Sequence, residues 1–199
     1  MKTILIATHN KKKKQELKSL LTDCGDAEIL TIDDLAGEPP VIVEDGKTFR
    51  QNAVKKAVIM SNFFDGLVLA DDSGLEVEAL LGKPGVRSAR FARARATDEE
   101  NNKKLLNLLE TVPDGNRKAR FVCHIALASA GQLLDSVEGV VNGRIIEAKK
   151  GENGFGYDPL FVPEGYDTTF AEMTEADKNK ISHRARALNL IRESILKYL

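Results

Sequence analysis

Three short stretches of this chain combine turn-forming residues with side chains that can bind phosphate, a metal ion or a nucleobase. The first is a polar loop with a hydroxyl, a carboxamide and several ammonium groups, formed by Thr8, His9, Asn10, Lys11, Lys12 and Lys13. Backbone N–H groups at a helix start bind anions, and an anion would relieve the conflict between basic residues and the helix dipole. The stretch therefore suits a polyphosphate. Taken alone, its pattern slightly favours a capped surface helix with a solvated lysine face.

The second stretch, residues 71–74, places two carboxylates, a hydroxyl and a glycine directly after an apolar segment. Adjacent strand residues point to opposite faces of a sheet, so only one of Asp71 and Asp72 needs to face a ligand. A carboxylate beside Ser73, at the carboxyl end of a strand, suits Mg²⁺ together with phosphate. Glu44 follows another apolar segment and could supply a second carboxylate. A plain Asp-Ser-Gly turn and a solvated Glu44 would explain the same residues.

The third stretch, residues 154–159, has glycines on both sides of the aromatic residue Phe155. Glycine lets other groups approach closely, and an aromatic ring can stack on a base. A hairpin turn with a core aromatic has the same composition. Nearer the C-terminus, Lys178 and residues 182–184 lie about one helical turn apart at the start of a predicted helix. Arg184 carries only donors, which suits recognition of carbonyl oxygens on a base, whereas an exposed basic helix end is the alternative.

The apolar pattern predicts the elements that position these stretches. Short apolar segments predict buried strands at residues 4–7, 41–43, 67–70 and 160–162, and a long hairpin at residues 120–129 and 133–141. Asn10 is a favourable N-cap for the helix after the first strand. Two capping boxes, Thr48 with Gln51 and Thr97 with Glu100, predict two further helix starts. Helices interleaved with strands and a long antiparallel hairpin predict an α/β protein with a mixed sheet.

Helical spacing predicts which residues of these helices face the core. The helix after Thr97 is expected to bury Leu105, Leu108 and Leu109. A final helix carries one continuous apolar face, formed by Ile181, Ala185, Leu188, Ile191 and Ile195. His124 lies inside a predicted strand, and we expect it to be a structural histidine whose hydrogen bonds are satisfied.

The composition is that of an ordinary globular protein. The chain has 199 residues, 42% hydrophobic and 30% charged, with a formal net charge of −1. This length suits one sizeable domain or two closely packed lobes, and the charge provides no global field for nucleic acid. Cys24 and Cys123 are far apart, which predicts two buried thiols in a reducing compartment. No signal peptide or membrane span is visible, so we expect a cytoplasmic protein.

Taken together and in this order, the motifs resemble those of the inosine triphosphate pyrophosphatase family, over essentially the whole chain. The family's Thr-x-Asn-x-x-Lys opening is matched by Thr8, Asn10 and Lys13. The later blocks are Glu44 with Thr48-Phe49 and Asn52-Ala53, residues 70–75, residues 84–92, residues 154–159 and residues 182–184. Ordered blocks are far more specific than any single motif. One departure is His9, where the family usually has glycine, and a positive φ there would cost energy.

The resemblance implies an elongated two-lobed fold on a long twisted mixed sheet with flanking helices, forming one domain over residues 1–199. It also implies a cleft between the lobes, a homodimer and Mg²⁺ as cofactor. Lys13 would hold the triphosphate with Thr8 and Asn10, within a substrate loop that includes His9, Lys11 and Lys12. Asp72 would bind Mg²⁺ and help to activate water, and Glu44 would be the second metal-associated carboxylate. Ser73 would contact phosphate, and the nucleoside pocket would comprise Phe155, Gly156, Tyr157, Asp158, Lys178, His183 and Arg184.

The implied activity is cleavage of non-standard purine nucleoside triphosphates (ITP, dITP and XTP) to the monophosphate and pyrophosphate. Donors aimed at the 6-oxo oxygen would reject adenine, which has an amino group there. A Maf-like pyrophosphatase for other odd nucleotides is an alternative, but the blocks around Phe155 and Arg184 argue against it. A non-catalytic nucleotide- or RNA-binding protein that uses residues 11–14 leaves Glu44, Asp71 and Asp72 without a purpose. We therefore expect a purine nucleotide substrate and neither a nucleic acid nor a membrane partner.

Overall fold

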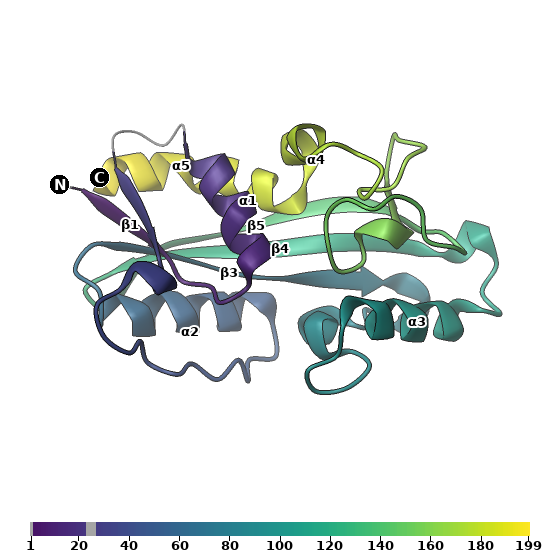
Figure 1. Cartoon of the computed structure of the whole chain (residues 1–199), viewed down its shortest axis with the longest axis horizontal. Coiled ribbons are helices and arrows are strands. Elements are labelled where there is room, and N and C mark those ends of the chain that lie inside the picture. The colour runs from purple at the N-terminus through teal and green to yellow at the C-terminus, as the bar shows by residue number, and fades with distance from the viewer. Residues whose placement is uncertain (1, 23–26) are drawn as a thin grey trace. The chain divides into compact units, whose positions relative to one another are not determined.

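The computed structural model describes residues 2–22 and 27–199, which fall into two compact units (Figure 1). Unit 1 is formed by the described residues of Met1–Asp72, Cys123–Gly139 and Arg184–Leu199. Unit 2 is formed by Ser73–Val122 and Val140–His183. Cys24 lies outside the described residues, so the prediction of a buried thiol is tested only for Cys123, which is a buried free cysteine.

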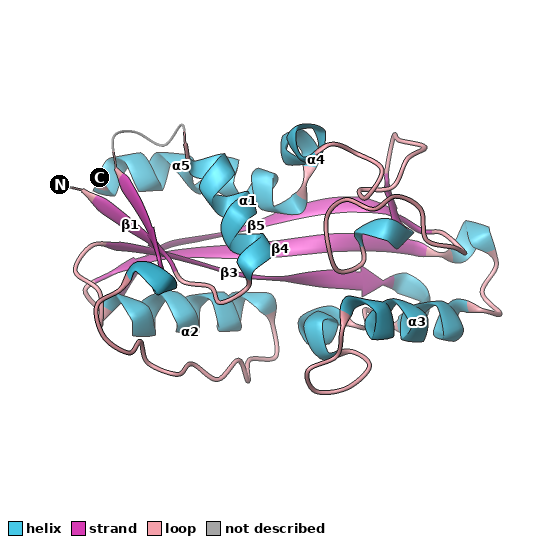
Figure 2. Cartoon of the chain, in the orientation of Figure 1, coloured by secondary structure: helices cyan, strands magenta, loops and turns pink. Residues whose placement is uncertain are grey.

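Strands and helices alternate in the first part of the described chain, and three successive strands followed by two helices complete it (Figure 2). The strands are β1 (Thr3–Ile6), β2 (Glu28–Thr31), β3 (Leu67–Val77), β4 (Lys118–Ser129), β5 (Gln132–Ile145) and β6 (Phe161–Pro163). The helices are α1 (Lys11–Leu21), α2 (Phe49–Ser61), α3 (Asp98–Leu109), α4 (Glu175–Ile181) and α5 (His183–Tyr198). Among the described residues, the strands follow the sheet order β2-β1-β3-β4-β5-β6. Strand β1 is parallel to β2 and β3, whereas β5 is antiparallel to β6, which confirms the predicted mixed sheet of an α/β protein.

Alternate residues of β3 in unit 1 face two different helical layers. Leu67 and Leu69 are buried in a cluster with residues of α1 and α5, whereas Val68 and Ala70 are buried in a cluster with residues of α2. Figure 1 shows α1 and α5 close together, with α2 apart from them. A period of two is the rule for a strand. The next two residues, Asp71 and Asp72, therefore continue this alternation.

Unit 2 has its own apolar core. Leu105 and Leu109 of α3 are fully buried, together with residues of β3, β4, β5 and β6. Phe121 of β4 and Phe161 of β6 pack edge to face, with their ring centroids 4.7 Å apart. Aromatic pairs of this kind favour one packing arrangement and contribute about 0.5–1.5 kcal/mol beyond their buried area.

Local side-chain chemistry sets several element boundaries as predicted. The Asn10 side chain caps α1 by accepting from the backbone N–H groups of Lys12 and Lys13. The Thr97–Glu100 capping box at the start of α3 is complete in both directions. β4 and β5 are joined through Ala130 and Gly131, whose φ angles are +47° and +74°. Two consecutive positive φ angles are typical of the turn that connects adjacent strands.

One predicted strand is wrong, and another extends further than predicted. Residues 41–43 lie in irregular structure rather than in a strand, and the side chains of Val41 and Val43 are 94% and 63% exposed. An apolar segment without a neighbouring strand has no partner for its backbone hydrogen bonds. The strand predicted at residues 67–70 does not end there, because β3 continues through Asp71, Asp72 and Ser73 to Val77. The site carboxylates are thus held in a strand and not in a turn.

Three predictions about helices are also corrected. The final helix is two helices, α4 and α5, because Ser182 between them has extended backbone angles of φ −63° and ψ 155°. Leu108 is 46% exposed, unlike its buried neighbours in α3. At the start of α2 the Thr48 hydroxyl accepts from the Gln51 N–H, but the Gln51 side chain accepts from Lys47 N. The reciprocal half of that capping box is therefore shifted by one residue.

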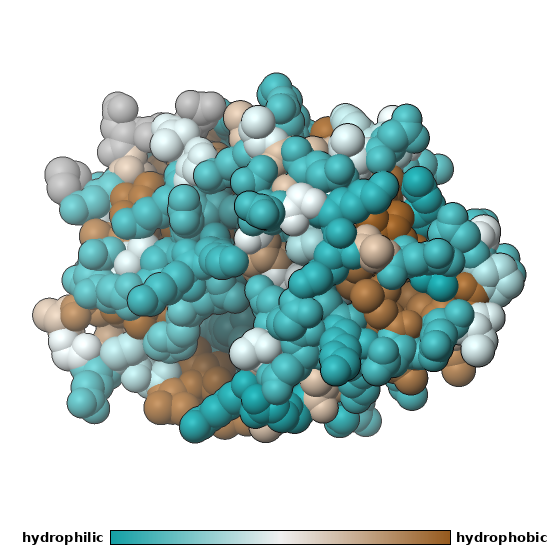
Figure 3. Space-filling view, turned by 45° about the vertical axis from the view of Figure 1, so that its right-hand side comes forward, coloured by the Kyte–Doolittle hydropathy of each residue, from teal (hydrophilic) through white to brown (hydrophobic). Residues whose placement is uncertain are grey.

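The face drawn in Figure 3 is mostly hydrophilic, with apolar side chains in smaller groups between the polar ones. Of the helices in the described part of the chain, none combines the length and the apolar character that a membrane span requires.

Candidate active site

The predicted phosphate loop is a rigid helix cap that presents lysines. Asn10 Oδ1 accepts from Lys12 N and Lys13 N at 3.0 and 3.1 Å, and Thr8 Oγ1 accepts from Asn10 N at 3.3 Å. His9 is exposed and is not among the described non-glycine residues with positive φ. The energetic cost of a positive φ at His9 therefore does not arise. Lys11 and Lys12 are also exposed, so an anion at this loop would meet ammonium groups rather than these two capped N–H groups.

Lys13 is directed by a buried carboxylate that the sequence left without a role. Its Nζ donates to Asp71 Oδ2 at 2.9 Å, and the Asp71 side chain is fully buried. Burial alone would raise the pKa of Asp71, but the charges of Lys13, Arg184 and Lys56 hold it well below its usual range. Asp71 is therefore a permanent anion that fixes the position of the Lys13 ammonium group.

Arg184 is the second cation on Asp71. Its guanidinium, 1% exposed, pairs with Glu16 of α1 through Nη1 and approaches Asp71 Oδ2 at 3.4 Å through Nη2. Burial would lower the pKa of Arg184, but the Asp71 and Glu16 carboxylates raise it above its usual value. The structure thus places Arg184 in a buried ion-pair network of unit 1, while its predicted contact with a base stays a prediction.

Asp72 faces the opposite layer and has different partners. Its Oδ2 accepts from Asn52 Nδ2 of α2 at 2.8 Å, and the residue is 6% exposed. Burial raises the pKa of Asp72, although the charges of Lys13 and Lys56 and the Asn52 hydrogen bond oppose the shift. The charge of Glu44 raises it further, so these two carboxylates act on each other electrostatically.

Glu44 and the backbone of β3 are linked by Lys56, a residue that the sequence analysis missed. Lys56 Nζ donates to Glu44 Oε1 at 2.6 Å and to the Asp71 carbonyl oxygen at 2.5 Å. Burial would lower the pKa of Lys56, but Asp71, Glu44 and Asp72 raise it. Asn52 and Lys56 are four residues apart and so lie on one face of α2. That spacing, next to the Asn52-Ala53 block, is the sequence signal that could have identified Lys56.

The donor set in unit 1 fits a divalent cation that is shared with a ligand. Among the described residues, no group of three or more His, Cys, Asp or Glu side chains could hold a metal ion alone. Glu44 and Asp72 provide hard carboxylate oxygens. Mg²⁺ is commonly bound by one or two carboxylates together with substrate phosphates, rather than by a complete protein cage. The charge of Glu44 contributes to the raised pKa of Asp72, which is compatible with this arrangement.

In unit 2, the predicted base-binding residues form a connected cluster. Asp158 Oδ2 accepts from Phe155 N at 2.8 Å and from Lys178 Nζ at 2.6 Å, and both Asp158 and Lys178 are almost completely buried. The Lys178 ammonium also lies 5.0 Å from the centroid of the half-buried Phe155 ring. A Cβ at Gly154, which has φ +72°, would lie 2.2 Å from Asp158 Oδ2. Glycine is therefore required for this close packing.

Other predicted residues of unit 2 have internal partners. The Tyr157 hydroxyl donates to the Ser88 carbonyl oxygen at 2.9 Å, and Gly156 N donates to Asp98 Oδ2 at 2.8 Å. The His183 ring stacks on Phe121, with centroids 4.8 Å apart and planes inclined by 9°. Ser73 is half-buried in β3. These contacts position the loop and do not by themselves test a role in binding.

His124 departs from the sequence-based expectation. It is 6% exposed, and both ring nitrogens are buried without a hydrogen-bond partner in the described part of the chain. Burial, followed by the charge of Arg50, lowers the pKa of His124. The prediction of a satisfied histidine is therefore wrong. Ala126 and Ala128, at the next alternate positions of β4, belong to the apolar cluster that includes residues of α2.

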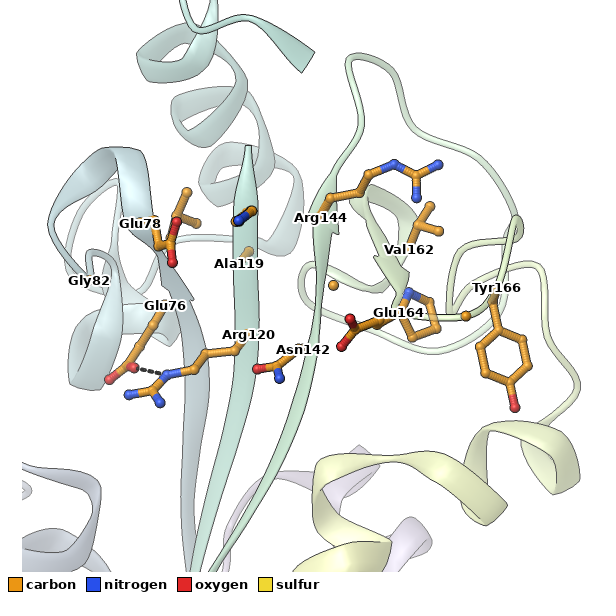
Figure 4. A pocket seen from close by; sticks show the side chains of 15 residues that line it. Glu76, Glu78, Gly82, Ala119, Arg120, Asn142, Arg144, Val162, Glu164 and Tyr166 are labelled. Carbon is orange, nitrogen blue, oxygen red and sulfur yellow. Dashed lines mark hydrogen bonds and ion pairs between the residues drawn. The ribbon is translucent and has the colours of Figure 1, made fainter. Parts of the chain in front are cut away.

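Unit 2 also contains a groove of about 740 Å³ (Figure 4). Its lining includes Glu76 and Arg120, which form an ion pair at 2.7 Å, as well as Arg144 and Tyr166. None of the residues predicted for the site is part of this lining.

Comparisons with known proteins cover nearly the whole chain. The Ham1 family model matches residues 4–194. A protein of Desulforamulus reducens named dITP/XTP pyrophosphatase is 50% identical over 185 residues, which cover 93% of this chain and 91% of the relative. The solved Ham1 protein structure from Staphylococcus aureus has a TM-score of 0.85 and 39% identity and covers 98% of both chains. The HAM1 protein structure from Coxiella burnetii has a TM-score of 0.87 and 38% identity, covering 99% of this chain and 100% of the other.

Proposed function

The chain belongs to the Ham1 family, and on that basis we propose that it hydrolyses non-standard purine nucleoside triphosphates to the monophosphate and pyrophosphate. ITP, dITP and XTP are the proposed substrates. The observation that carries the proposal is the buried Asp72 carboxylate, on which the charges of Lys13, Lys56 and Glu44 act. Breaking a phosphoanhydride needs charge neutralisation and an oriented water rather than a covalent nucleophile.

We assign the triphosphate to the groups of unit 1. Lys13, oriented by Asp71, would bind the phosphates and offset the negative charge that develops on the departing pyrophosphate. Asp72 would orient a water molecule and accept its proton as the water attacks the α-phosphorus. The bond from that phosphorus to the bridging oxygen then breaks and pyrophosphate leaves. Lys56 would keep the Glu44 carboxylate and the Asp71 carbonyl oxygen in place during this step.

We propose Mg²⁺ as the cofactor, with Glu44 and Asp72 as its protein ligands. When bound, it would neutralise phosphate charge and bring the triphosphate to the carboxylates. The support is the pair of hard oxygen donors described above. Ca²⁺ prefers more ligands and longer distances than Mg²⁺. With Ca²⁺ in place of Mg²⁺, the protein should still bind nucleotide but turn it over more slowly, as measured by pyrophosphate release.

We assign the purine to the groups of unit 2. Phe155 can stack on the base, and Lys178 presents a donor next to it that is held by Asp158. A donor that is fixed in a buried site favours a 6-oxo group and disfavours the 6-amino group of adenine, because adenine would leave it unpaired. We also propose that the protein acts in the cytoplasm and that, as the resemblance implies, it forms a homodimer. Analytical ultracentrifugation would test the dimer.

The test is a product assay with Mg²⁺ in which ITP, XTP, dITP, ATP, GTP and dTTP are offered separately and the nucleotides are resolved by chromatography. We expect IMP or XMP with pyrophosphate and little turnover of the standard nucleotides. IDP with phosphate would contradict the proposal, and preferential turnover of dTTP would favour the Maf-like alternative. Binding without turnover, with an affinity that falls steeply with salt, would favour the nucleotide- or RNA-binding alternative.

A further inference from the structure

Asn52 links the two carboxylates to which we assign the metal. It lies in the first turn of α2, is 1% exposed, and uses both ends of its side-chain amide. Nδ2 donates to Asp72 Oδ2 at 2.8 Å, and Oδ1 accepts from the backbone N–H of Gly46 at 2.8 Å. The amide orientation follows from chemistry, since a backbone N–H can only donate and a carboxylate accepts. Gly46 is two residues beyond Glu44 in the irregular segment before α2.

The segment that carries Glu44 is attached to α2 by a series of side chains. Besides the Asn52 bond, Gln51 Oε1 accepts from Lys47 N at 2.7 Å, and Lys55 pairs with Asp45 at 2.6 Å. Gln51 and Asp45 are exposed, and water can replace contacts of this kind at little cost. The Asn52 contact is buried and also includes Asp72, so its loss affects both carboxylates together.

Gly46 is fitted to Asn52. A Cβ at position 46 would lie 2.5 Å from Asn52 Oδ1 and 2.8 Å from Gln51 Cβ. Real Cβ atoms essentially never come that close, so any other residue must displace the amide or the segment. The glycine and the asparagine therefore form one packed unit, and either position can be used to perturb the link.

We propose that Asn52 is a positioning residue that holds Asp72 and the Glu44 segment in one arrangement for a divalent cation. The inference rests on the proposed function, because it concerns the same site. A carboxylate that rotates freely must be ordered when the cation binds, which weakens the affinity. Removing a group that hydrogen-bonds to a metal ligand and orients it typically changes metal affinity or activity by about 10- to 100-fold. Asn52 has such a position, because it binds the Asp72 carboxylate directly and holds the Glu44 segment through the backbone of Gly46.

The experiment measures Mn²⁺ binding by electron paramagnetic resonance for the intact protein and its variants, without substrate, so that water molecules complete the coordination of an ion held by the two carboxylates. Asn52→Leu removes both hydrogen bonds and keeps the number of side-chain heavy atoms and the branch at Cγ, and Gly46→Ala perturbs the same link from the other side. We expect Mn²⁺ to bind about 10- to 100-fold more weakly in both variants. The matched control is Gln51→Ala, which removes the neighbouring tether without touching Asp72 and should bind Mn²⁺ within about threefold of the wild type. Combining Asn52→Leu with Gly46→Ala should add little, because both changes break one link.

A second readout separates positioning from simple stabilisation. Thermal unfolding is followed for every variant, and a merely structural asparagine would lower the midpoint while leaving Mn²⁺ binding by the folded protein unchanged. That outcome, or Mn²⁺ binding by Asn52→Leu within about threefold of the wild type, overturns the inference. Should Asn52→Leu fail to fold, Gly46→Ala decides in the same way.

Hydrolysis of ITP by the same samples distinguishes this inference from the proposed function. A wild type that hydrolyses ITP, with variants that bind Mn²⁺ normally, overturns the inference alone. A wild type that binds Mn²⁺ but hydrolyses no purine triphosphate overturns the proposed function, while the effect of Asn52 on Mn²⁺ binding is still measured. A wild type that binds no Mn²⁺ overturns the inference.

Discussion

Replacing Arg184 with methionine removes a buried guanidinium that lies against two carboxylates. The Arg184 side chain is 1% exposed, and those of its partners Glu16 and Asp71 are 9% and 0% exposed. Methionine matches the aliphatic part of the arginine side chain and carries no charge, so the change removes the guanidinium and its positive charge. Asp71 keeps its contact with Lys13 at 2.9 Å, whereas Glu16 loses a direct ion pair inside the protein. The variant therefore leaves buried negative charge poorly compensated.

The expected cost follows from this burial. Removing one partner of a buried ion pair costs about 3–5 kcal/mol, because the remaining charge cannot return to water. For a chain of this size, that corresponds to a decrease of roughly 6–20 °C in the unfolding midpoint. A typical domain has a total free energy of unfolding of about 5–15 kcal/mol. We therefore expect Arg184→Met to fold with a reduced free energy of unfolding.

Urea denaturation followed by circular dichroism measures this cost. Arg186→Met is the matched control, since Arg186 is exposed on the same helix and should change the free energy of unfolding by no more than about 0.5 kcal/mol. Adding Glu16→Leu to Arg184→Met should recover part of the loss, because an apolar pair in place of a buried ion pair is often tolerated. An Arg184→Met variant within about 1 kcal/mol of the wild type would refute the reasoning. The ratio of ITP to ATP turnover, measured on the same variant, tests the predicted base contact separately.

Three further predictions concern the site and its surroundings. Asp72→Asn should reduce pyrophosphate release from ITP by about 100- to 10,000-fold with an unchanged circular dichroism spectrum, because the amide cannot accept a proton from water. Phe155→Leu should raise KM for ITP roughly 5- to 100-fold with little change in kcat, which steady-state kinetics would detect, since base stacking contributes about 1–3 kcal/mol. The lowered pKa of His124 means that the unfolded chain binds more protons than the folded chain as pH falls through 6.5, so stability declines with acidification. His124→Leu should remove this contribution to the pH dependence of the free energy of unfolding, which is at most about 1.4 kcal/mol per pH unit. Urea unfolding between about pH 5.5 and 7.5 measures it, and an unchanged dependence on pH would contradict the prediction.

Features set by neighbours in the sequence could be predicted. The Asn10 cap, the Thr97–Glu100 capping box and the turn at residues 130–131 each depend on residues within a few positions of one another. Their chemistry is local, so the surrounding fold has little influence on whether they form. The same locality explains the correct prediction of the hairpin strands and of the buried face of α5.

Features that depend on distant neighbours could not be predicted. Residues 41–43 have the apolar pattern of a strand, but no strand in the described part of the chain pairs with them. β3 continues through two aspartates because Lys13, Arg184, Asn52 and Lys56 neutralise or bind them, and those residues come from three other helices. A polar pair in a sequence indicates a turn only when nothing elsewhere in the chain compensates its burial.

The continuation of β3 also bears on which of the two adjacent carboxylates accepts a proton, a question that the sequence left open. A strand sends Asp71 and Asp72 to opposite layers, and the layers differ in charge. Asp71 meets two cationic side chains directly, and its charge is used to orient Lys13 and to balance Arg184. Asp72 meets the neutral amide of Asn52 and receives the lysine charges less directly. Environments that push the pKa values of two identical groups apart give those groups different roles. The alternation of one strand thus supports a structural role for Asp71 and the proposed proton-accepting role for Asp72, even though the two residues are identical and adjacent in the sequence.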